Sequence, residues 1–150
     1  MSRWRIIGLG SPQADDRFGW QVIEQLQQED LPESVELLAL DRPGVSLLHY
    51  LQGADQILLV DACDTGQKPG SLIRLSGDEL LDAVAEPVFS SHHLGIVDTL
   101  LLGRACRLNL PPITLMLAQL GTLAPMQPLT ADLFRAVEQS KQQILLLLQS

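Results

Sequence analysis

WRIIGLGSPQADDRFGWQVIEQL, residues 4–26, joins a short apolar run to a pattern of helical period. Residues 4–9 have the composition of a buried strand, and Gly8 and Gly10 at its end predict a tight turn. Beyond the turn, four apolar residues fall on one face of a helix: Phe18, Val22, Ile23 and Leu26. A strand, a turn and a helix in this order are typical of the opening of an α/β fold.

The same alternation continues to the end of the chain. Apolar runs predict further strands at residues 35–40, 56–60, 71–75 and 113–120. Helical patterns occupy residues 45–52, 78–83, 93–105 and the segment after Thr130, an N-cap residue type. The expected apolar stripe of the last helix consists of Leu133, Phe134, Val137, Ile144, Leu145 and Leu148. Right-handed crossovers place helices on both faces of such a sheet, which predicts a three-layer α/β/α sandwich with a mostly parallel twisted sheet.

Length and composition restrict the class of protein. The 150 residues predict a single domain, and the apolar content of 46% with only 4% aromatic residues predicts an aliphatic core. A net charge of −8 disfavours nucleic acid or an anionic membrane surface as partner and suits a cation or a basic peptide. Two cysteines without paired spacing and no apolar run long enough to span a membrane predict a cytoplasmic protein, which we expect to be a monomer.

Acidic side chains stand where the predicted strands end. Asp15 and Asp16 follow the first strand, Asp41 ends the second, Asp61 ends the third, and His92 opens a later helix. Ligands of open α/β sheets bind beyond the carboxyl ends of the strands. Carboxylates gathered there repel each other unless they share a cation or a proton, and adding an imidazole gives an O,O,N ligand set that suits nickel or zinc better than calcium. We therefore predict a metal site at this edge.

The acidic pair and the glycine turn also have simpler interpretations. One of the two carboxylates at positions 15 and 16 is sufficient to cap the following helix, and Arg17 could orient the other. Gly8-Leu9-Gly10 is reminiscent of a dinucleotide-binding turn, but Gln13 stands where that motif needs its third glycine. We expect these two glycines to serve the turn.

Nucleophilic catalysis is the competing chemistry. Serines are available at positions 11, 46, 90 and 91, with histidines at 49, 92 and 93 as candidate bases, but the sequence contains no G-x-S-x-G motif. Cys63 is either a nucleophile or an inert core thiol, and burial favours the second interpretation.

Three segments together resemble a known family, the hydrogenase maturation proteases: GLGSPQADDRFG at residues 8–19, LLVDA at 58–62 and SSHHLG at 90–95. These endopeptidases process the large subunit of nickel-iron hydrogenases. The resemblance implies that residues 1–150 form one hydrogenase maturation protease-like domain, an aspartyl-type or metal-dependent peptidase. It implies catalytic and metal-contacting roles for Asp16, Asp61 and His92.

The resemblance also implies a partner and a cofactor. The partner is the hydrogenase large-subunit precursor, from which a C-terminal extension is removed after nickel insertion. Nickel is expected to arrive with the precursor, and zinc or cadmium to substitute for it. The alternative is a non-catalytic escort protein that recognises the metallated large subunit.

Two departures from the family pattern concern the surroundings of this site. Ser11 replaces the asparagine that usually follows the glycine turn, and residues 41–44 lack the common glycine-threonine pair. No role is carried over onto His93. We therefore expect recognition of the precursor to be specialised while the three predicted ligands are retained.

Overall fold

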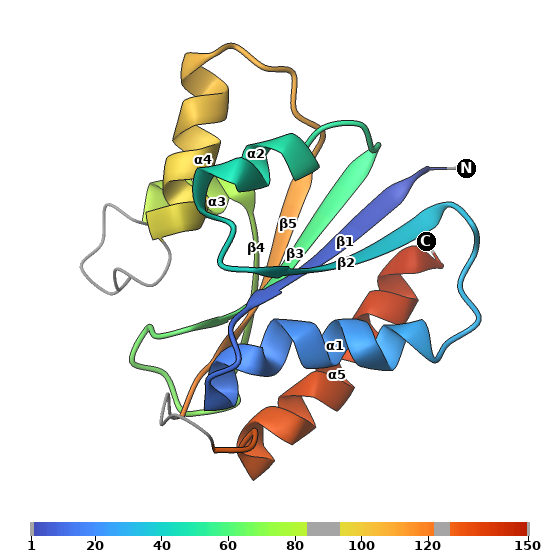
Figure 1. Ribbon diagram of the computed structural model, residues 1–150, viewed down its shortest axis with the longest axis vertical. Helices are drawn as coiled ribbons and strands as arrows, with labels where there is room; N and C mark the ends of the chain where they lie inside the picture. Colours follow the sequence, from blue (N-terminus) through green and yellow to red (C-terminus); the bar gives the residue numbers. More distant parts are fainter. Residues whose placement is uncertain (1, 84–93, 122–126, 150) are drawn as a thin grey trace.

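Strands and helices alternate along the chain, as the sequence predicts (Figure 1). The computed structural model describes residues 2–83, 94–121 and 127–149. The strands are β1 (Trp4–Gly10), β2 (Val35–Asp41), β3 (Gln56–Cys63), β4 (Leu72–Ser76) and β5 (Ile113–Gln119). The α-helices are α1 (Phe18–Gln27), α2 (Leu47–Tyr50), α3 (Gly77–Ala83), α4 (Leu94–Ala105) and α5 (Ala131–Leu148), and two 3-10 turns are η1 (Ala14–Arg17) and η2 (Gly44–Ser46).

The five strands form one sheet in the order β2-β1-β3-β5-β4. The four strands β2, β1, β3 and β5 are parallel, and β4 lies antiparallel on the edge beside β5. From β1 the chain moves to one side to form β2 and then crosses to the other side to form β3. The boundary between β1 and β3 is therefore the topological switch point of the sheet, where α/β folds bind their ligands.

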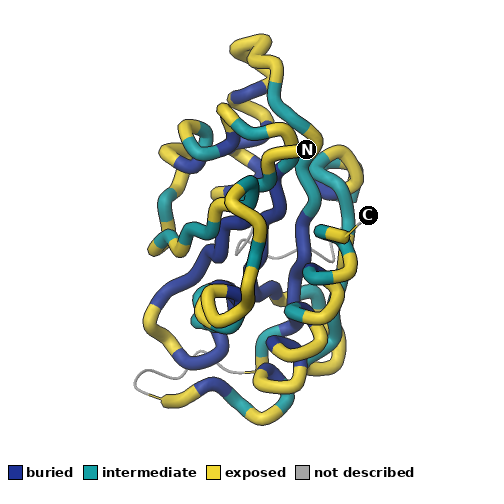
Figure 2. The backbone as a smooth tube through the Cα atoms, turned by 90° about the vertical axis from the view of Figure 1, so that its right-hand side faces the viewer, coloured by how far each residue is buried: buried dark blue, intermediate teal, exposed yellow. Residues whose placement is uncertain are grey.

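Helices cover both faces of the sheet, which confirms the three-layer sandwich (Figure 1). On one face, Ile6, Leu58 and Met116 of the strands pack with buried residues of α1 and α5. On the other face, Leu59 and Leu115 pack with buried residues of α2, α3 and α4. Figure 2 shows these buried stretches running through the molecule with exposed segments around them. Both cores are mainly aliphatic, as the composition predicts.

The sheet opens at its switch point. The pairing of β1 with β3 ends at Gly8 and Val60. Beyond it, β1 stays paired with β2 as far as Gly10, and β3 stays paired with β5 as far as Cys63. The two central strands therefore part before either of them ends, and the gap between their carboxyl ends is bounded by backbone on both sides.

Glycines set the distance between α1 and the sheet. A Cβ atom on Gly19 would lie 2.3 Å from the Leu9 carbonyl oxygen and 2.5 Å from that of Val60, and a Cβ on Gly8 would lie 2.3 Å from the Gly19 carbonyl oxygen. The prediction that Gly8 and Gly10 serve a tight turn is wrong, because both lie within β1. They are needed for the close approach of α1 and η1 to the strand.

Three local predictions differ from the structure. Strand β3 continues to Cys63, so that Asp61 lies inside the strand, paired with Leu117, instead of following its end. The helix expected at 45–52 is shorter, divided between η2 and α2. Phe134 is 57% exposed and does not belong to the buried stripe of α5, since it lies about 100° around the helix from the buried Leu133.

The predicted start of the last helix is confirmed. Thr130 has the extended backbone of an N-cap residue, and its carbonyl oxygen accepts the N–H of Phe134 at 3.0 Å. Within the described residues, no helix combines the length and the apolar character that a membrane span requires.

Candidate active site

A cavity of about 220 Å³ lies at the switch point, on the face of the sheet that carries α2 and α4. It is smaller than the roughly 300–1,000 Å³ of ordinary small-molecule sites. Asp16 of η1 and Asp61 of β3 both line it. The other lining residues are Leu9, Gly10, Arg42, Pro43, Gly44, Leu47, Gly95 and Ile96. The prediction that carboxylates meet at this edge of the sheet therefore holds for these two.

Asp61 is a charged residue on a face of β3 whose other residues are apolar. Residues alternate along β3, and Ile57, Leu59 and Cys63 on the same face are fully buried, whereas Asp61 is 7% exposed. Its carboxylate accepts the N–H of Ala62 at 2.8 Å. Ala62 lies beyond the last residue pair between β1 and β3, so β1 does not accept its N–H. The carboxylate of Asp61 provides the acceptor instead.

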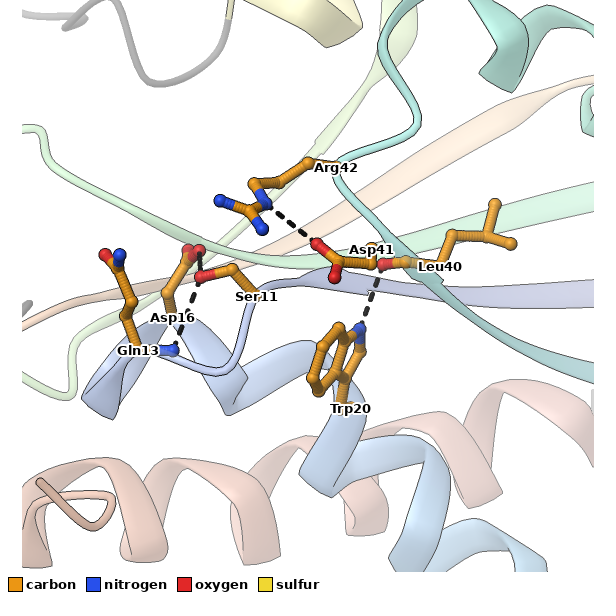
Figure 3. Close-up of polar contacts among 7 residues, drawn as sticks. All are labelled: Ser11, Gln13, Asp16, Trp20, Leu40, Asp41 and Arg42. Carbon is orange, nitrogen blue, oxygen red and sulfur yellow. Dashed lines mark hydrogen bonds and ion pairs between the residues drawn. The ribbon is translucent and has the colours of Figure 1, made fainter. Parts of the chain in front are cut away.

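Asp16 is oriented by a short polar loop. The Ser11 hydroxyl donates a hydrogen bond of 2.5 Å to Asp16 Oδ2, and the Ser11 N–H donates to the Asp16 carbonyl at 3.2 Å. The Asp16 N–H in turn donates to the Gln13 carbonyl at 2.8 Å. Figure 3 shows this loop beside the end of β2. The sequence offers Ser11 as a candidate nucleophile, but its hydroxyl is buried against Asp16 and serves to position that carboxylate.

Asp15 faces away from the cavity. It is fully buried and accepts the N–H of Gly121 at 2.7 Å, the N–H of Thr130 at 2.9 Å and the Thr130 hydroxyl at 3.1 Å. The predicted capping of its own helix is wrong, since η1 and α1 have no side-chain cap. Arg17 likewise does not orient the pair as proposed, because its Nη2 donates to the Gln127 carbonyl at 3.1 Å.

Arg42 lines the cavity on the β2 side, next to Asp41 at the end of β2. Arg42 Nε lies 2.8 Å from Asp41 Oδ1, and this bond raises the pKa of the guanidinium above its usual value, with a smaller contribution from Asp16. Arg42 has a positive φ of 42°, and its N–H donates to the Gly10 carbonyl at 3.1 Å. Nearby, Trp20 Nε1 donates to the Leu40 carbonyl at 2.9 Å (Figure 3). The carboxylate of Asp41 is thus neutralised locally.

The competing nucleophile Cys63 has the properties of a core thiol. The side chain is fully buried, and this burial, with the nearby charge of Asp61, raises the pKa of the thiol to about 12. A thiol with this pKa is protonated at neutral pH and is a poor nucleophile. Of the candidate bases, His49 lies in α2 with its ring 5.3 Å from that of Tyr50.

His92 lies outside the described residues, as do Ser90, Ser91 and His93. The described residues contain no group of three histidine, cysteine or acidic side chains that could hold a metal. Two carboxylates on one cavity fit the oxygen-donor part of the predicted O,O,N set. The nitrogen donor of that set is the predicted role of His92.

The chain is similar to proteins of one kind. A family model described as hydrogenase maturation protease matches residues 20–146, a range that includes Asp61 and His92 and begins after Asp16. The structure is similar to that of the hydrogenase maturating endopeptidase HybD from Escherichia coli, with a TM-score of 0.85 and 27% identity, over 98% of this chain and 92% of that one.

Curated relatives are similar in sequence. The hydrogenase expression/formation protein HupD of Bradyrhizobium diazoefficiens is 30% identical over 109 residues, 69% of this chain and 57% of its own length. The hydrogenase 2 maturation protease of Escherichia coli is 28% identical over 97 residues, 63% of this chain and 59% of its own length. The chain spans about half the length of the curated relatives it matches. Because the family model covers most of the sequence, the chain belongs to the hydrogenase maturation protease family.

Proposed function

We propose that this chain is a nickel-dependent endopeptidase that removes the C-terminal extension of a nickel-iron hydrogenase large-subunit precursor after nickel insertion. The observation that carries the proposal is that Asp16 and Asp61, two of the three residues singled out by the resemblance, line one cavity at the switch point of this family's fold. In this proposal nickel belongs to the substrate, because it arrives bound to the precursor. The protein acts as a monomer in the cytoplasm.

The proposed roles follow from the side chains. Asp16 and Asp61 contact the metal through carboxylate oxygens, and His92 contacts it through a ring nitrogen; zinc or cadmium can replace nickel there. A divalent metal supplies Lewis-acid polarisation of a carbonyl group. The Ser11 hydroxyl fixes the rotamer of Asp16, and a carboxylate fixed in this way is also suited to accept a proton from the attacking water.

Replacing the three residues tests the proposal. A nickel-loaded precursor incubated with the protein should lose its extension, visible as a size shift on a gel. Asp16→Asn, Asp61→Asn and His92→Ala should each lower the rate by at least about 100-fold, since removing a transition-state contact commonly has this effect. Asp98→Asn, which changes an exposed carboxylate of α4, is the matched control and should cleave like the wild type.

Three further results would contradict the proposal. Full processing by all three variants would show that the cavity is not the active site, provided that circular dichroism shows them folded. Cleavage of a nickel-free precursor at the same rate would remove the nickel dependence. Stable association with the precursor without any size shift would favour the escort protein instead.

A further inference from the structure

We propose that the apolar wall of the cavity is a subsite for one aliphatic side chain of the precursor next to the cut bond, and that Gly95 sets the size of this subsite. The inference rests on the proposed function, since it describes the substrate of the same site. It concerns the part of the cavity that the carboxylates do not form.

The cavity has one acidic side and one aliphatic side. Asp16 and Asp61 are accompanied by Leu9, Leu47 and Ile96, which are at most 5% exposed and belong to the core beneath α2 and α4. A group bound against these side chains therefore lies beside both carboxylates. The volume of about 220 Å³ is below the range of small-molecule sites and is better suited to a single side chain.

The charges around the cavity favour a neutral occupant. An acidic side chain would be repelled by Asp16 and Asp61, which line the same space. A basic side chain would have to leave water for the apolar wall of the cavity, next to Arg42 at the rim. An aliphatic side chain avoids both costs and removes apolar surface from water.

Gly95 lies on the cavity wall in the first turn of α4. No heavy atom of the described residues lies within 4 Å of the position that a Cβ would take there, in contrast to the 2.3 Å contacts at Gly8 and Gly19. Its φ is not positive either, so the backbone does not require glycine. Glycine also weakens a helix relative to alanine. Among the described residues, neither packing nor backbone conformation accounts for this glycine, whereas the open space that it leaves at the cavity does.

Filling that space tests the inference. Precursors carrying Ala, Val, Leu or Phe on either side of the cut bond are compared with wild type, Gly95→Ala and Gly95→Leu. We expect the wild type to prefer Val or Leu at one of the two positions. Gly95→Leu should lower the ratio of kcat/KM for Leu over Ala at that position by at least about tenfold, within the range that pocket size gives in enzymes. Gly95→Ala should shift it in the same direction by less.

Asp98→Leu is the matched control, because it places the same side chain on an exposed position of α4 away from the cavity lining. It should leave the preference as in the wild type. Unchanged preference in both Gly95 variants, with melting temperatures showing that they are folded, would overturn the inference.

A binding measurement separates this inference from the proposed function. Peptides spanning the cut site are titrated against wild type and Gly95→Leu by calorimetry. If nothing is cleaved but the Leu peptide binds the wild type at least about tenfold more tightly than it binds Gly95→Leu, the subsite stands and the peptidase proposal fails. Equal binding of the Ala and Leu peptides by both proteins would overturn the subsite whether or not the precursor is cut.

Discussion

Adjacent aspartates have different environments in this protein. Asp16 lines the cavity with Asp61, whereas Asp15 binds the backbone at Gly121 and Thr130. In a 3-10 turn successive side chains point about 120° apart, so one residue of such a pair can face the site while its neighbour faces the core. The pattern of strand ends predicts that carboxylates gather at this edge, but it does not say which of the two reaches the cavity.

The role of Ser11 could not be predicted from the pattern. Its hydrogen bond to Asp16 depends on the path of the loop between them, which passes through Ala14 with a positive φ of 39°. Alanine rarely adopts this conformation, and nothing in its sequence context signals it. Contacts that close a loop of this kind depend on the surrounding fold.

We expect Cys63 to make stability depend on pH in alkaline solution. Burial raises the pKa of its thiol from 9.0 to about 12. The unfolded chain therefore releases this proton at lower pH than the folded chain, and stability falls as the pH rises from about 9 towards 12. Between pH 8 and pH 10, urea unfolding should show that the wild type loses about 1.4 kcal/mol more than Cys63→Ala.

Thiol labelling gives an independent check. The exposed Cys106 should react with an alkylating reagent at pH 8 in the folded protein, while Cys63 should react only after unfolding. Equal pH dependence in wild type and Cys63→Ala would show that the thiol is not held in its protonated form by the fold.

Secondary structure is the part of the fold that the sequence predicts best. Apolar runs located all five strands and helical periodicity located the main helices, because both report the face that each element buries. The apolar run ends before Asp61 and so predicts an end of β3 three residues before the observed one at Cys63. A strand continues past a polar residue when its neighbour continues, and β5 pairs with β3 as far as Cys63.

The packing of α1 on the sheet gives a prediction for Gly19. Helix propensity alone would make Gly19→Ala stabilising by about 1 kcal/mol. The added Cβ would lie 2.3 Å from one backbone oxygen and 2.5 Å from another, and backbone cannot move aside as a side chain can. We therefore expect a net loss of at least about 2 kcal/mol in urea unfolding, in line with the cost of overpacking.

Gly95→Ala is the matched control for this prediction. It makes the same change in the first turn of another helix, where the described residues leave the Cβ position open. It should stabilise the protein by about 0.5–1 kcal/mol. Equal effects of the two substitutions would mean that α1 does not pack on the strands as closely as described.

The arrangement of the whole molecule was predicted only in part. Alternating strands and helices indicate a mostly parallel sheet with helices on both faces, and the structure confirms this. The order β2-β1-β3-β5-β4 was not predicted, because periodicity says which face an element buries and not which strand lies beside it. The position of the cavity depends on this order, since only neighbouring strands that part can leave a gap between them.

Asp15 connects distant parts of the chain, and its replacement should lower the free energy of unfolding of the whole molecule. Its carboxylate accepts hydrogen bonds from positions 106 and 115 residues further along the sequence. Asp15→Ala would remove this acceptor from the partly buried hydrogen bonds of the Gly121 and Thr130 N–H groups, at a cost of about 2 kcal/mol in the free energy of unfolding. Amide hydrogen exchange should accelerate at both positions.

Asp132→Ala is the control for this change. It removes a carboxylate from the first turn of the same helix, α5, where Asp132 is partly exposed and pairs with the exposed Arg135. Its effect should be below about 1 kcal/mol, as for other surface ion pairs. If both variants lost the same stability, Asp15 would not have the connecting role that its hydrogen bonds suggest.

The elements that form the cavity differ in how readily they accept substitutions during evolution. Asp61 belongs to a central strand and Asp16 to a turn fixed by Ser11, whereas Arg42 and Pro43 belong to the segment that connects β2 to η2. Connecting segments tolerate substitution better than strands do. After gene duplication, one copy could therefore acquire a new protein substrate through substitutions at the rim, while both copies keep the two carboxylates. Such lineages would differ in substrate recognition before they differ in the reaction that they catalyse.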